Sequence, residues 1–228
     1  FQGFGNLAFS LLAVSGLVVA AIPVLMGRGV LDFSTRQWVA FIGFVTLVAD
    51  GFPWFGADVG GVLAIVPAFG VLWLMAEGGR INLKKIAAVC GVGVFVLAGL
   101  AAFDLSRPES AQTHLGRFAR KLVNGDAGTV IKRKLSANTH MLTSSVWTWL
   151  VPIVALFFVV LMFRSNGALR RARTAISGLD ALIISATVLG VLGFAVNDSG
   201  VVIPSMMFGV LVPLTLALLV RMEQEGGA

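Results

Sequence analysis

LAFSLLAVSGLVVAAIPVLM, residues 7–26, is an apolar run that contains no charged side chain. A helix of roughly 20 apolar residues is long enough to cross the hydrocarbon core of a bilayer. The rest of the chain has the same character: 57% of its 228 residues are hydrophobic, 12% are charged, and the mean hydropathy is +0.94. Soluble domains carry about 25% charged residues. The sequence therefore predicts an integral membrane protein.

Six further apolar runs follow the first one along the chain. The predicted spans are 7–26, 38–54, 60–76, 84–103, 146–163, 176–196 and 201–220. The second run is short and ends at Pro53, so it also fits a re-entrant or interfacial segment, which would leave six spans. We predict an all-α polytopic fold in which residues 1–228 form a single transmembrane domain of about seven helices.

The connections between the runs differ in charge. Residues 27–37, 77–85 and 164–175 carry Lys and Arg, whereas the short connections 55–59 and 197–200 carry none. Because cytoplasmic loops are enriched in Lys and Arg, we expect the first three in the cytoplasm, with the amino end outside and the carboxy end cytoplasmic. A net charge of +6 on a membrane protein indicates loops near anionic headgroups rather than nucleic-acid binding.

Two aspartates lie in the apolar stretch VADGFPWFGADVGGVLAIVP (48–67), which has no basic residue. A carboxylate near hydrocarbon is unfavourable unless it finds water or a partner. The predicted topology places both aspartates at the outer rim of the bundle, together with other polar residues. This rim set is Asn6, Asp50, Asp58, Asp104, Asn197 and Asp198. Helix capping alone would explain Asp58 and Asp198, but it explains Asp50 less well because Asp50 ends a span.

The long connection 104–145 is predicted to be an extracytoplasmic insertion between spans four and five. It contains two amphipathic patterns, one from Ala111 to Leu122 and one from Val130 to Leu142. Short basic amphipathic helices outside the membrane tend to lie on its surface. In the simpler interpretation, their Lys and Arg contact lipid phosphates without specificity.

A sharper interpretation gives three of these basic residues a defined ligand. Arg107, Arg117 and Lys134 would point into a pocket against Asp50, Asp58 and Asp198. Such a pocket would suit a phosphate or pyrophosphate headgroup, since arginine forks match phosphate oxygens. The predicted partners are therefore a membrane lipid with an anionic or polyprenyl-phosphate headgroup and a domain or subunit outside the membrane, and not nucleic acid.

The sequence offers few candidates for catalytic or metal-binding residues. His114 and Asp58 are weak candidates for a catalytic role, and a structural or surface histidine is the simpler interpretation of His114. The other histidine, His140, is not at a metal-ligand spacing from His114, so no metal site is assigned and the cofactor is unknown. The single cysteine, Cys90, is expected to be a buried structural thiol. Whether the chain is an enzyme stays open.

Five short segments carry a resemblance to a known family. In chain order they are FQGFGN, GADVGG, DLSRPESAQTHLGRF, RKLSANTHML and NDSG. Together they resemble the carboxy-terminal membrane portion of large bacterial proteins of actinobacteria and Firmicutes. Members of that family carry an extracytoplasmic domain similar to the alkaline phosphatase superfamily ahead of the membrane part. Related sequences often have a glutamate where this chain has Leu7.

The resemblance implies a bacterial plasma membrane and a chain that is a fragment of a longer protein. The leading hypothesis is recognition of an anionic lipid or a lipid-linked cell-envelope precursor at the outer leaflet, together with an extracytoplasmic domain. Two alternatives stay open. One is a structural anchor or assembly subunit without a site of its own, and the other is a transporter or lipid flippase.

Overall fold

The computed structural model describes most of the chain. The described residues are 5–52, 54–56, 58–79, 81–108, 111–112, 114–123, 125, 127–144, 148–149, 151–153, 156, 160, 167–197 and 200–226. Within them the fold is all-helical and has no β-strand. The elements are α1 (Asn6–Met26), α2 (Thr35–Gly51), α3 (Val59–Met75), η1 (Ala76–Gly78), α4 (Leu83–Leu105), α5 (His114–Val123), α6 (Ala127–Ser144), α8 (Ala168–Ala175), α9 (Leu179–Val196) and α10 (Val202–Gly226).

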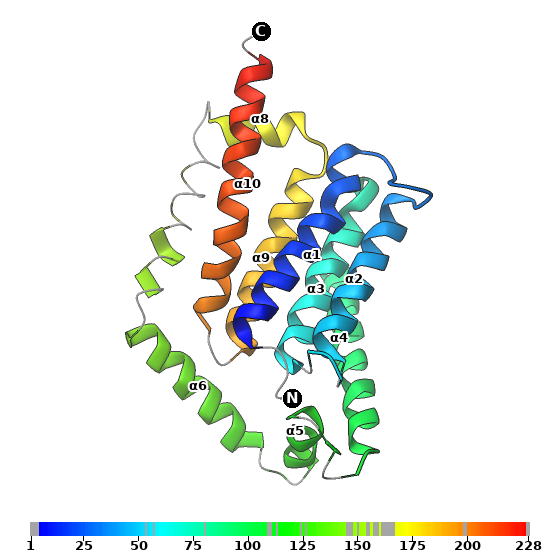
Figure 1. Ribbon diagram of the computed structural model, residues 1–228, viewed down its shortest axis with the longest axis vertical. Coiled ribbons are helices and arrows are strands. Elements are labelled where there is room, and N and C mark those ends of the chain that lie inside the picture. The colour runs from blue at the N-terminus through cyan, green and yellow to red at the C-terminus, as the bar shows by residue number, and fades with distance from the viewer. Residues whose placement is uncertain are drawn as a thin grey trace.

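Five of the described helices are long and apolar enough to cross a bilayer, namely α1, α3, α4, α9 and α10. The chain is therefore a polytopic helical membrane protein, as predicted. The second predicted span forms α2, whose 17 residues pack along α1 and α3 (Figure 1). The fifth predicted span, 146–163, falls largely outside the described residues, although 151–153 are helical.

Most residues of the core come from α1 and α3; α2 and α9 pack on both of these helices, and α10 packs on α1 and α9. Phe9, Leu17 and Leu72 are fully buried there. Small residues let the helices approach closely: a side chain on Gly43 would lie 2.9 Å from the ring of Phe69. Close packing through small residues is the usual way in which helices associate in lipid, where apolar side chains alone give little driving force.

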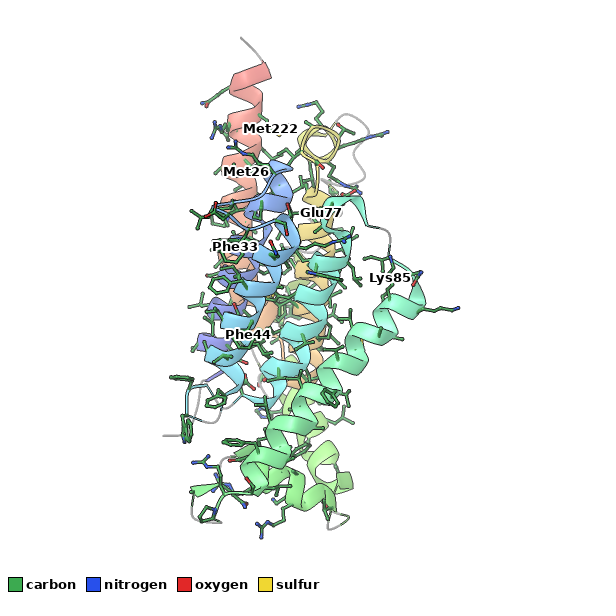
Figure 2. All side chains as sticks on the ribbon, turned by 90° about the vertical axis from the view of Figure 1, so that its right-hand side faces the viewer. Met26, Phe33, Phe44, Glu77, Lys85 and Met222 are labelled. Carbon is green, nitrogen blue, oxygen red and sulfur yellow. The ribbon has the colours of Figure 1, made fainter. Side chains whose placement is uncertain are left out.

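Helix α4 packs on one side only. It contacts α3 and α5, and it diverges from the bundle toward Lys85 (Figure 2). Phe95 is 79% exposed, and Cys90 is exposed as well. The prediction of a buried Cys90 is therefore wrong, because apolar side chains on a membrane helix need only lipid and not protein around them.

The two ends of the bundle differ in charge. The basic connections 27–37 and 77–85 and the helix α8 lie at one end, where Arg36 pairs with Glu77 at 3.6 Å and Arg173 with Asp180 at 2.5 Å. The hydrogen bond to Asp180 raises the pKa of Arg173 above its ordinary value. Helices α5 and α6 lie at the opposite end (Figure 1). We call this opposite end, where α1, α3 and α10 begin and α2 and α9 end, the rim.

Candidate functional site

Asp50 is a fully buried acidic residue at the rim. It lies in the last turn of α2, its side chain is 0% exposed, and both carboxylate oxygens lack a hydrogen-bond partner among the described residues. Its Oδ2 lies against Gly61 in the first turn of α3, so that a side chain on Gly61 would collide with it. A buried polar group without a partner is rare enough to need an explanation.

The connection between α2 and α3 folds back over Asp50. The backbone N–H of Asp58 donates to the carbonyl of Asp50 at 3.0 Å, and that of Gly56 donates to Ala49 at 2.9 Å. A side chain on Gly56 would collide with the Asp50 carbonyl, so the fold-back requires glycine at this position. These contacts hold the carboxylate of Asp50 against the beginning of α3.

Asp58 and Asn197 meet Asp50 at the same turn. Asp58 is the N-cap of α3 and its Oδ1 accepts the N–H of Gly60 at 2.9 Å, so the expected capping role is confirmed. Asn197 follows α9 and is 4% exposed; its Nδ2 donates to the Gly193 carbonyl at 3.3 Å. Its Oδ1 faces Gly60, where an added side chain would lie 2.5 Å away. We call Asp50, Asp58 and Asn197 the rim cluster.

Asp104 lies apart from this cluster, in the last turn of α4, and it fixes α5 in place. The side chain of Asp104 is fully buried. Its Oδ2 accepts a hydrogen bond from the N–H of Gly116 at 2.7 Å, and its Oδ1 accepts one from Nη1 of Arg107 at 3.0 Å. Gln112 strengthens the same joint by donating from Nε2 to the carbonyls of Leu105 at 3.2 Å and Arg107 at 2.9 Å. Asp104 is therefore tied to the joint between α4 and α5.

Arg107 also lies over an aromatic patch. Its guanidinium carbon is 5.7 Å from the ring centre of Trp54, within the range of a cation–π interaction. The patch is made of Phe52, Trp54, Phe55 and Phe103. Trp54 is 63% and Phe55 53% exposed. Exposed aromatic rings of this kind mark the headgroup level of a bilayer.

Helix α5 has a basic face and is fixed to the end of α4, the helix that contributes Phe103 to this patch. Leu115 and Gly116 are buried, whereas Arg117 and Lys121 are exposed. Arg120 is half-buried and donates from Nη2 to Oε1 of Gln112 at 3.2 Å. The helix is thus amphipathic, as predicted, with cations on its open side.

The remaining predicted site residues are less informative. Asn6 opens α1, and its carbonyl accepts the hydroxyl of Ser10 at 2.5 Å. His114 and Lys134 belong to α5 and α6, but their side chains lie outside the described part of the structure, as does Asp198. An open hollow of about 440 Å³ on α6 involves His140 and Lys132.

The rim offers oxygen atoms rather than nitrogen or sulfur as ligands. In the described part of the chain, no three His, Cys, Asp or Glu side chains group closely enough to hold a metal ion. The rim cluster instead combines two carboxylates with an amide oxygen. The sequence predicts its third member, Asn197, because this polar residue ends an apolar run. No sequence pattern predicts the contact of Arg107 with Trp54.

Comparison with known proteins finds no matching family model, no matching curated protein and no matching solved structure. The resemblance to the membrane portion of phosphatase-linked bacterial proteins therefore stays an expectation.

Proposed function

We propose that this protein binds the phosphate headgroup of an anionic lipid, or of a lipid-linked envelope precursor, at the outer face of a bacterial plasma membrane. The observation that carries the proposal is the exposed basic face of α5, with Arg117 and Lys121, on a helix fixed to the end of α4 that contributes Phe103 to the aromatic patch. Both kinds of side chain suit a headgroup site. Cations pair with the phosphate, and aromatic rings lie at the level of the headgroups.

The joint at Asp104 supports a positioned site rather than a loose basic loop. Buried hydrogen bonds from Gly116 and Arg107 to Asp104 fix the first turn of α5 on the end of α4. Arg117 directly follows the glycine that is held in this way. A fixed arginine loses less conformational freedom on binding a phosphate than one on a mobile segment, which favours affinity.

The charge distribution gives a second argument. The positive-inside rule assigns the end with α8 to the cytoplasm, which leaves α5 outside, where topology requires no basic residues. A ligand that carries phosphate gives these cations a role. The bound lipid would lie within reach of an extracytoplasmic domain that acts on it.

Lipid binding to the purified chain in mild detergent tests the proposal. Native mass spectrometry would follow titration with short-chain phosphatidylglycerol and a short polyprenyl phosphate, with phosphatidylcholine as the comparison lipid. A charge-assisted hydrogen bond contributes about 1.5–3 kcal/mol, so Arg117→Ala is expected to weaken binding of the anionic lipids by about 10- to 100-fold.

Arg28→Ala is the matched control, because Arg28 is an exposed arginine at the opposite end. It is expected to leave the affinity within about twofold, because exposed charges beyond roughly 10 Å are largely screened by salt. Equal losses in both variants would mean general attraction to negative lipid and would refute the proposal. No loss in either variant would favour the structural anchor.

A further inference from the structure

We propose that the rim cluster, Asp50, Asp58 and Asn197, binds a sodium ion at the first turn of α3. This site is separate from the basic face of α5 and does not depend on the proposed lipid binding.

The first argument is the state of Asp50. Its carboxylate is fully buried, and neither oxygen accepts a hydrogen bond from a described residue. None of the ion pairs among the described residues includes Asp50, and the guanidinium of Arg107 is already paired with Asp104. An ionised carboxylate in such a place requires a counter-charge.

The beginning of α3 does not supply that counter-charge by itself. A helix N-terminus carries a partial positive charge of roughly half an elementary unit, and a capping carboxylate is the usual partner for it. Asp58 occupies the cap position and accepts the N–H of Gly60. With both carboxyl groups ionised, the rim cluster carries one negative charge more than the cap of α3 uses, and a monovalent cation would balance it.

The donor atoms suit a hard cation. Oδ2 of Asp50 lies against Gly61, and Oδ1 of Asn197 lies against Gly60, so oxygens from α2 and from the end of α9 converge on neighbouring residues of one turn. The amide nitrogen of Asn197 is held by Gly193, which turns the amide oxygen toward α3. Carboxylate and amide oxygens suit hard cations, and transporters coordinate sodium at helix C-terminal ends, which Asp50 and Asn197 occupy on α2 and α9.

The glycines make the approach possible. Side chains at Gly60 and Gly61 would occupy the space that the oxygens of Asn197 and Asp50 now fill. The sequence GADVGG, residues 56–61, thus supplies both the capping acid and the room for the two other oxygen donors.

Sodium binding can be measured directly on the full chain in detergent. Equilibrium dialysis with radioactive sodium, at constant ionic strength with choline as the replacement cation, is expected to give saturable binding near one ion per chain. Asp50→Asn is expected to abolish it, and Asn197→Ala is expected to weaken it at least tenfold. Asp180→Asn is the control, because Asp180 is an acidic residue at the opposite end; this variant is expected to bind sodium like the unaltered protein.

Thermal unfolding followed by tryptophan fluorescence gives the second readout. Saturating sodium is expected to raise the Tm of the unaltered protein by at least about 3 °C relative to choline, and not that of Asn197→Ala. Absence of saturable sodium binding, equal binding by Asp50→Asn, or stabilisation by calcium or magnesium alone would overturn the proposal. Asn197→Ala keeps the test decisive if Asp50→Asn does not fold.

The experiments can refute the lipid proposal and the sodium proposal independently of each other. Arg117→Ala is expected to keep sodium binding, and Asn197→Ala is expected to keep lipid binding.

Discussion

At the scale of single residues, the environment of Asp50 depends on glycine. Gly56 and Gly61 have no side chain where the backbone carbonyl and the carboxylate of Asp50 approach them. Neither glycine needs a positive φ, so the constraint is space and not backbone conformation. Adding a side chain at either glycine tests how closely Asp50 approaches it.

Gly61→Ala is expected to destabilise the protein by about 1–3 kcal/mol, because the added methyl group collides with a buried carboxylate and neighbouring Phe9 leaves little room. The measurement is the free energy of unfolding in mixed detergent micelles. Gly91→Ala is the matched control: Gly91 has open space around it, and alanine favours a helix over glycine, so the change should be neutral or stabilising. Equal effects of the two substitutions would contradict the close approach.

The basic residues divide by their contacts. Arg107 is held by Asp104 and Trp54, whereas Arg117 is exposed. Among the described residues Arg117 forms no ion pair, so a phosphate can reach it directly, whereas it has to compete with the buried carboxylate of Asp104 for Arg107. We therefore expect Arg117→Ala to lower lipid affinity more than Arg107→Ala, when both are measured by native mass spectrometry on folded protein. The reverse order would place the headgroup at the joint between α4 and α5.

At the scale of elements, α5 depends on α4 for its position. Asp104 joins the end of one helix to the first turn of the other. The sequence predicts that Asp104 ends a span, but it does not predict the partner of Asp104. Asp104 and Gly116 belong to two different helices, so helical periodicity cannot relate them.

Asp104→Ala is expected to release α5 from α4. The loss leaves the Gly116 N–H buried without an acceptor and removes the ion pair of Arg107, at a cost of about 1–3 kcal/mol for the unsatisfied group. Limited trypsin digestion should then cut faster at Arg117 and Lys121. Asp32→Ala, an exposed aspartate at the other end, is the control. An unchanged cleavage rate in Asp104→Ala would show that α5 is held by other contacts.

The helices show what periodicity can and cannot predict. Apolar runs located α1, α3, α4 and α9 to within three residues at each end, because lipid demands an uninterrupted apolar stretch, whereas α10 extends six residues beyond its predicted end at residue 220. Helix α2 begins at Thr35 rather than at residue 38, since Ser34 and Gln37 form a capping box. The capping-box signature Ser-x-x-Gln is present at residues 34–37, so the start of α2 has a local sequence signal that the apolar run does not show.

At the scale of the whole molecule, the alternation of spans brought distant residues to one end. Asp50, Asp58 and Asn197 were predicted to share the rim from charge and span order alone. The sequence could not predict that these three residues lie at one turn of α3, because their proximity depends on how α9 packs against α3. Burial of both oxygens of Asp50 likewise depends on the packing of α2, α3 and their connection.

The orientation in the membrane is the prediction on which the lipid proposal depends. Cys90 is the only cysteine, so Cys90→Ala gives a background for single-cysteine labelling. Ser34 lies at the basic end and Ser106 at the joint to α5, and both are exposed. We expect a membrane-impermeant maleimide to label Ser106→Cys in intact cells and Ser34→Cys only after permeabilisation, because basic connections stay in the cytoplasm. The opposite pattern would place α5 and the rim cluster at the cytoplasmic face, where an outer-leaflet headgroup could not reach Arg117.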